Sequence, residues 1–217
     1  MKTDSVLKKE VEEELKWEPS VNAAEIGVAV KNGVVTLTGY VNSYPEKWAA
    51  ERSVKRLKDV KAIAEEIEVK LLGSSQRTDG DIAKAASNAI EWNTYIPRDR
   101  VKVMVHDGWV TLEGEVEWWY QKGAAETSVR NLSGVRGVAN KITIKPKLSV
   151  ENVETEIKKA FQRNATLDAR QIWAETSGSR VILHGKTRTW LERQEAEDGA
   201  WAAPGVTAVE DQITVTG

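Results

Sequence analysis

The stretch GVVTLTG at residues 33–39 returns as GWVTLEG at residues 108–114 and, more weakly, as SRVILHG at residues 179–185. Apolar residues alternate with other residues in each copy, which is typical of a strand with one buried face. The correspondence continues without a gap on both sides of this strand. Matching apolar positions include Leu7, Ile82 and Val153 before it and Ile67, Ile142 and Ile213 after it. The chain therefore repeats one structural unit three times.

The repeat predicts three modules, at residues 4–69, 79–144 and 150–215. The linkers between them, KLLGSSQRT and KPKLS, are polar and rich in turn-forming residues. With the flanking residues included, the expected domain limits are 1–72, 77–146 and 148–217. A module of about 65 residues has a marginal core. We therefore expect the modules to dock on one another or on further copies of the chain.

Within the first module, Asp4 is placed to cap a helix whose apolar stripe is Leu7, Val11 and Leu15. Two strands follow, joined by KNG at residues 31–33, and the second module has HDG at the equivalent place. Asn or Asp followed by Gly supplies the positive φ angles of a tight hairpin turn. The pattern thus predicts a helix followed by a β-hairpin.

The second helix of each module begins after the hairpin. Ser43 with Glu46, and Thr189 with Glu192, have the spacing of a capping box. The second module has Trp118 at the capping position, and we expect Gly134 to end its helix. A last strand completes the order α-β-β-α-β. The expected fold class is α+β, with three tandem αββαβ modules, each a three-stranded sheet with two helices on one face.

This pattern resembles the BON domain, the module of bacterial osmotic-shock and nodulation proteins. The segments that carry the resemblance begin VAVKNGVVTLTG at residue 28 and VMVHDGWVTLEG at residue 103. The third copy diverges, with Ser179 in place of the turn glycine. The resemblance implies a non-enzymatic protein associated with stress and with phospholipid membranes. Some relatives bind ions or small ligands, so an ion or ligand sensor stays an alternative.

The bulk composition excludes several classes of protein. The 31 basic and 33 acidic residues leave a net charge of −2, which argues against nucleic-acid binding. There is no cysteine, and no apolar run reaches the ~20 residues of a transmembrane helix. The N-terminal segment is charged and does not resemble a signal peptide. If Met1 is the native start we expect a cytoplasmic protein, whereas the family resemblance implies a periplasmic one.

The sequence offers no catalytic constellation. His106 falls in a hairpin turn and His184 on a strand, and neither has a neighbour at metal-ligand spacing. We read both as exposed structural residues. The sequence therefore predicts no enzyme activity, no metal site and no cofactor.

Nine tryptophans stand against one phenylalanine. Comparison of the copies separates core from surface, because a core position should be apolar in all three. Trp109 aligns with Val34 and Arg180, and strand alternation places it on the sheet face away from the helices. The aromatic residues that we expect at a binding surface are Trp48, Trp109, Trp118, Trp119, Tyr120, Trp173 and Trp201.

Three partners remain open for these tryptophans: another module, a second copy of the chain in a homo-oligomer, or an anionic phospholipid surface. Basic residues crowd the second helix of the first module, and Lys55 and Arg56 are the ones we expect to attract anionic lipid. An ordinary solvated helix face is the alternative interpretation of that cluster.

Overall fold

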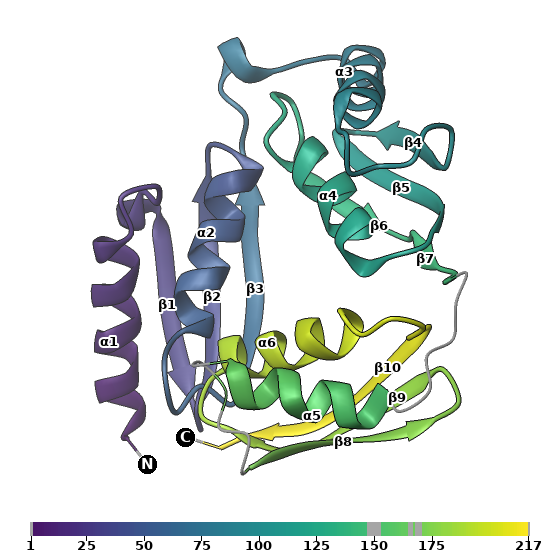
Figure 1. Ribbon diagram of the computed structural model, residues 1–217. Helices are drawn as coiled ribbons and strands as arrows, with labels where there is room; N and C mark the ends of the chain where they lie inside the picture. Colours follow the sequence, from purple (N-terminus) through teal and green to yellow (C-terminus); the bar gives the residue numbers. More distant parts are fainter. Residues whose placement is uncertain (1, 147–152, 165–166, 168–170, 217) are drawn as a thin grey trace. The chain divides into compact units, whose positions relative to one another are not determined.

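The computed structural model describes residues 2–146, 153–164, 167 and 171–216. The linker KPKLS and the start of the third module at residue 150 lie partly or wholly outside the described residues. Three repeated modules are present, as the sequence predicts (Figure 1). The first contains α1 (Asp4–Trp17), the short 3-10 turn η1 (Ala23–Glu25), β1 (Ile26–Lys31), β2 (Val34–Val41), α2 (Tyr44–Lys55) and β3 (Ala62–Val69).

The second and third modules repeat this order. The second begins after a short 3-10 turn, η2 (Gly73–Ser75), and contains α3 (Asp79–Trp92), β4 (Val101–His106), β5 (Trp109–Val116), α4 (Trp119–Arg130), β6 (Gly137–Asn140) and β7 (Thr143–Ile144). The third contains α5 (Val153–Arg163), β8 (Ile172–Ser177), β9 (Arg180–Thr187), α6 (Trp190–Trp201) and β10 (Ala208–Val215).

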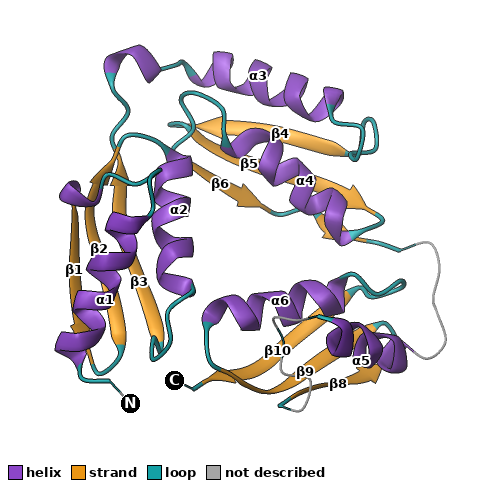
Figure 2. Ribbon diagram, turned by 60° about the vertical axis from the view of Figure 1, so that its left-hand side comes forward, coloured by secondary structure: helices purple, strands orange, loops and turns teal. Residues whose placement is uncertain are grey.

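Each module is a small mixed sheet with its second strand in the centre. In the second module β4 pairs antiparallel with β5, and β6 and β7 pair parallel with β5. Both helices of each module cover the same face of its sheet (Figure 2). The α+β class and the one-sided helical layer predicted from the sequence are therefore confirmed. The other sheet face of each module has no covering element among the described residues of that module, and the outer edge of its first strand pairs with no further strand there.

The cores follow the two periodicities of the sequence. Val35 and Leu37 on β2, and Val110 and Leu112 on β5, are fully buried beneath the helices, whereas Trp109 is 52% exposed. The first helices contribute stripes with a spacing of four residues, and the second helices contribute one alanine and one valine each in the first two modules. Full burial of each large aliphatic side chain favours folding by roughly 1.5–3 kcal/mol.

The first helix is capped differently from the expectation. Thr3 and Thr78 are the N-cap residues, and their hydroxyls accept from the N–H groups of Val6 and Asp81. Asp4 lies inside the first turn, and its carboxylate instead accepts from the N–H groups of Asn32 and Gly33, at 2.7 and 3.0 Å. The aspartate therefore ties the helix to the hairpin turn, a role that a local sequence pattern cannot show.

The hairpin turns form as predicted. Asn32 and Gly33 have φ angles of 54° and 79°, so both central residues adopt the left-handed conformation of a type I′ turn. The third module differs, because Gly178 alone has positive φ in its turn. Glycine is also required at Gly114, where φ is 145° and an added methyl group would overlap the carbonyl of Arg100. That close approach explains why the repeated stretch ends in glycine.

The capping boxes form at Ser43 and Thr189, whose hydroxyls accept from the third helical N–H at 3.3 and 3.1 Å. At the same position Trp118 has no hydroxyl, and the Gln121 side chain accepts from the Trp118 N–H at 3.1 Å. The assignment of Gly134 as the helix C-cap is wrong. The helix α4 ends at Arg130 with Asn131 as its C-cap, and Gly134, with φ of 94°, lies in the turn that follows.

Candidate functional site

One end of the second module gathers exposed aromatic side chains. The helix α3 ends there at Trp92, and the loop that follows leads into the start of β4. Val101 at the start of β4 pairs with Gly114 near the end of β5. Since α4 follows β5 directly in the chain, α4 begins at the same end of the module as the end of α3 (Figure 2). We call the exposed residues of this end the aromatic end of module 2; they are Trp92, Tyr95, Trp118 and Tyr120.

The four side chains of this end are exposed by 85%, 65%, 37% and 54% in that order. Tyr95 and Tyr120 meet edge to face, with ring centroids 6.0 Å apart and planes at 85°. Asn93 accepts from the N–H of Tyr95 at 2.9 Å, which orders the loop that carries this ring. Trp119, beside Trp118 in sequence, is half-buried, with the Lys122 ammonium 5.6 Å from its ring centroid.

A pocket of about 490 Å³ lies beside Trp92, and its walls are made by Glu91, Trp92, Asn93, Thr94, Ile96 and Arg98. Arg98 and Arg100 are exposed in the loop after α3. Asp99 lies between them in the sequence, Glu91 lines the same pocket as Arg98, and both acidic residues are exposed as well. The formal charge of this end is therefore close to balanced, and apolar aromatic surface is its main property.

The uncovered sheet faces carry two further tryptophans. Trp109 on β5 is 52% exposed, and Trp173 on β8 is 53% exposed. Trp173 stacks on its cross-strand neighbour His184, with ring centroids 5.6 Å apart. His184 Nε2 lies 3.6 Å from a carboxylate oxygen of Glu175. Both tryptophans thus lie where strand alternation places them, on the face away from the helices.

The other residues predicted to bind a partner are partly buried or ion-paired. Trp48 on α2 is half-buried, and Trp201 is partly buried against the core of the third module. Lys55 Nζ lies 2.8 Å from a carboxylate oxygen of Glu51. The Arg56 guanidinium lies 3.1 Å from Glu14 and 3.5 Å from Glu18, which both belong to the α1 region. These ion pairs offset the positive charge that the sequence suggested for lipid attraction.

Sequence comparison left Trp17 and Trp92 undecided between core and surface, and it did not single out Tyr95. Trp17 and Trp92 are 83% and 85% exposed, each as the last residue of its module's first helix. The signal was present, because both align with Arg163, a residue that does not belong in a core. Tyr95 carried no such signal, since its importance depends on the contact with Tyr120, which is distant in sequence.

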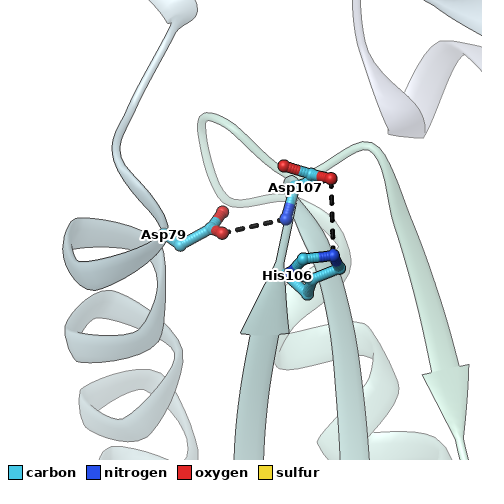
Figure 3. Close-up of side chains that lie close together, drawn as sticks. All are labelled: Asp79, His106 and Asp107. Carbon is cyan, nitrogen blue, oxygen red and sulfur yellow. Dashed lines mark hydrogen bonds and ion pairs between the residues drawn. The ribbon is translucent and has the colours of Figure 1, made fainter.

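A side-chain cluster at the opposite end of the second module contains Asp79, His106 and Asp107 (Figure 3). Asp79 accepts from the N–H groups of Asp107 and Gly108 at 2.8 and 2.9 Å, as Asp4 does in the first module. The hydrogen bond from the Gly108 N–H is the main cause that lowers the pKa of Asp79. The helix N-terminus beneath the cluster also favours an anion over a cation. The arrangement is therefore explained as a helix-to-turn connection, and it carries no metal assignment.

The fold and the exposed surfaces define a class of protein built from tandem small αββαβ modules with surface aromatic residues. The BON domain model matches the chain three times, over residues 3–70, 78–146 and 149–217. These matches cover nearly all of the sequence, so the chain belongs to the BON domain family.

Among curated proteins, the osmotically-inducible protein Y of Escherichia coli K12 is similar to this chain. The two are 27% identical over 146 residues, which span 65% of this chain and 73% of that protein. Two solved structures of CdsD, a structural protein of the type III secretion system of Chlamydia trachomatis, each share 14% identity. The match to the first structure spans 97% of this chain and 92% of the CdsD chain, with a TM-score of 0.25. The match to the second spans 100% of this chain and 100% of the CdsD chain, with a TM-score of 0.26. Scores this low carry no argument about function.

Within the described residues, none of the helices combines the length and the apolar character that crossing a bilayer requires.

Proposed function

We propose that the protein is a non-enzymatic BON protein of the osmotic stress response that docks on phospholipid surfaces through the aromatic end of module 2. The stress role is drawn from the similarity to the osmotically-inducible protein Y. The observation that carries the membrane proposal is the gathering of Trp92, Tyr95, Trp118 and Tyr120 at one end of one module, all exposed. Tryptophan and tyrosine favour the bilayer interface, where an apolar ring and a polar tip are both accommodated.

The charge near this end specifies the kind of attraction. Arg98 and Arg100 are adjacent to the acidic Glu91 and Asp99, so long-range attraction to an anionic bilayer is weak here. We therefore assign most of the binding free energy to insertion of aromatic rings at the interface. Anionic phospholipid adds a smaller contribution through the two arginines.

The test measures co-sedimentation of the full chain with phosphatidylcholine vesicles that contain phosphatidylglycerol. Trp92→Ala combined with Tyr120→Ala should lower the partition coefficient about tenfold or more, because two exposed rings no longer enter the interface. The matched control is Trp17→Ala, which removes an equally exposed tryptophan from the same position of the first module. Equal losses in the two variants, or no binding by the unaltered chain, would refute the proposal.

A protein partner is a second candidate, and the uncovered sheet faces favour it. Trp109 and Met104 are exposed on one such face, by 52% and 60%. Exposed tryptophan and methionine are enriched at protein interfaces. Homo-oligomerisation through this face predicts a sedimentation mass above 24.1 kDa without lipid, and Trp109→Arg should return the chain to the monomer mass.

A further inference from the structure

The pocket beside Trp92 holds two opposite charges that do not pair with each other. Its volume is about 490 Å³, and the charged residues among those that line it are Glu91 and Arg98. Within the part of the chain that the structure describes, neither of these side chains forms an ion pair or a hydrogen bond. Opposite charges that line one pocket without pairing are both available to the opposite charges of a ligand.

The end of the helix makes one side of this pocket favourable for a cation. Glu91 and Trp92 are the last two residues of α3, where the final carbonyl groups of a helix carry partial negative charge. The ring of Trp92 is 85% exposed, and the face of an indole attracts ammonium groups, quaternary ones included. The carboxylate, the indole and the helix C-terminus therefore all favour an ammonium group.

The loop after α3 makes the other side favourable for an anion. Arg98 presents a guanidinium group, whose paired N–H donors match the oxygens of a phosphate. The loop is held in place by Asn93, whose side-chain amide donates to the Ser128 hydroxyl of α4 at 2.9 Å and accepts from the Tyr95 N–H at 2.9 Å. These bonds order the wall of the pocket without a ligand, which lowers the entropic cost of binding one.

The first module provides an internal comparison. Trp17 ends its first helix at the position of Trp92 and is exposed to nearly the same degree. Lys16 stands there in place of the glutamate, and Ala23 in place of the arginine. The first module therefore keeps the ring and lacks both charges, so the pair of charges is specific to the second module.

We propose that this pocket binds a zwitterionic phospholipid headgroup, with its ammonium group between Glu91 and the ring of Trp92 and its phosphate on Arg98. The headgroup is assigned to a lipid because the pocket belongs to the end that we propose docks on phospholipid surfaces, and to this extent it rests on that function. In phosphocholine and phosphoethanolamine two carbons separate the two charges, so one pocket accommodates both. A phosphate without an ammonium group would meet the carboxylate of Glu91 with no compensating attraction.

The test titrates the full chain with glycerophosphocholine, which is water-soluble and forms no bilayer. The indole N–H resonance of Trp92, assigned by its absence in Trp92→Phe, reports occupancy by nuclear magnetic resonance. Saturable binding should appear with a Kd of roughly 1–10 mM, as expected for a small polar ligand. Choline carries the cation alone and glycerol 3-phosphate the anion alone, and each should bind at least about fivefold more weakly.

A double variant removes both contacts without changing the net charge. Glu91→Gln combined with Arg98→Gln should weaken glycerophosphocholine binding about tenfold or more. The matched control is Asp99→Asn combined with Arg100→Gln, which also removes one acid and one base from this end but alters no residue that lines the pocket. Its affinity should stay within about twofold of the unaltered chain. Circular dichroism establishes that both double variants are folded.

The outcomes separate the pocket from the membrane function. Equal weakening by the two double variants overturns the pocket, as does equal affinity for choline alone or an absence of saturable binding up to about 100 mM glycerophosphocholine. Vesicle binding that persists in that last case leaves docking by ring insertion intact, without headgroup recognition. Glycerophosphocholine binding by a chain that does not co-sediment with vesicles overturns the lipid as the source of the headgroup and assigns the pocket to a free zwitterion.

Discussion

The indole ring of Trp109 lies directly over the backbone of Gly137, its partner in the parallel pair of β5 and β6. A methyl group added at Gly137 would overlap the ring. The other two modules have smaller or flexible side chains at the tryptophan position, Val34 and Arg180, and each has an alanine at the glycine position, Ala62 and Ala208. The tryptophan and the glycine therefore act as one unit.

This pairing predicts a coupled pair of substitutions. Gly137→Ala alone should destabilise the second module, because the indole must leave the sheet. Trp109→Val together with Gly137→Ala, which recreates the Val34 and Ala62 pair, should recover most of that loss. Urea unfolding of the full chain measures the effect, with an expected coupling energy of about 1 kcal/mol. If the changes in the free energy of unfolding caused by Trp109→Val and by Gly137→Ala simply add in the double variant, the contact between the two residues does not contribute to stability.

Asp79 predicts a pH dependence. Its pKa is lowered from 3.8 by the N–H groups of Gly108 and Asp107. A carboxyl group with a lowered pKa in the folded state stabilises the fold above its unfolded pKa, and that stability is lost as the pH falls toward the folded value. Asp79→Asn should therefore melt at a lower temperature than the unaltered chain at pH 7. The difference between the two melting temperatures should begin to shrink below about pH 3.8 and should vanish only below the lowered folded-state pKa of Asp79. A constant difference down to pH 2 would contradict this role.

Trp118 predicts a conflict between stability and binding. It occupies the position of a helix cap, yet its side chain offers no oxygen to the N–H groups of α4. Trp118→Ser should raise the free energy of unfolding by about 0.5–1 kcal/mol, because serine accepts one of those N–H groups. The same variant should bind vesicles more weakly, since it removes a ring from the aromatic end of module 2. Calorimetry and co-sedimentation measure the two effects, and Thr189→Ala, expected to be destabilising, is the reverse control.

The basic face of α2 predicts a negative result for lipid. Lys55 and Arg56 are ion-paired with Glu51, Glu14 and Glu18. Replacing both with glutamate should leave vesicle binding unchanged and should lower stability by no more than about 1 kcal/mol, because the groups are at the surface. Loss of vesicle binding in this variant would instead show that the basic residues of α2 form the lipid-binding surface.

Balanced charge at the aromatic end of module 2 predicts weak salt dependence. Raising the salt concentration from 0.1 to 1 M shortens the screening length from about 10 Å to about 3 Å. Vesicle binding by aromatic insertion should survive this change nearly intact. A loss of about tenfold or more would show that electrostatic attraction carries the binding.

The fold could be predicted because its determinants are local and repeated. The alternation of Val35 and Leu37 assigns the buried sheet face, and the helical spacing of Leu7, Val11 and Leu15 assigns the buried helix face. Gly33 and Gly108 mark the turns because few other residues adopt positive φ. The error at Asp4 has a clear reason: its carboxylate bonds to a turn 28 residues away in the sequence, and a local pattern favours the nearer role of a cap.

The candidate site was predictable only in part. Trp118 and Tyr120 were identified from the sequence, because consecutive aromatic residues at the start of a predicted helix can be recognised without a structure. Tyr95 joins them through a ring contact across the module, and the ion pairs of Arg56 offset part of the charge of a helix that looked basic in the sequence. Both outcomes depend on residues that folding brings together.

The sequence by itself determined the module, its three repeats and the inward face of each element, because spacings of two and about 3.6 residues translate directly into faces. Tertiary structure decided which exposed residues meet. The end of α3 approaches the start of α4 only because the β4 and β5 strands are antiparallel, and the open edge of β4 lies beside Ile90 only because α3 packs over that strand. Contacts of this kind are set by strand order and helix packing, which no single stretch of the chain contains.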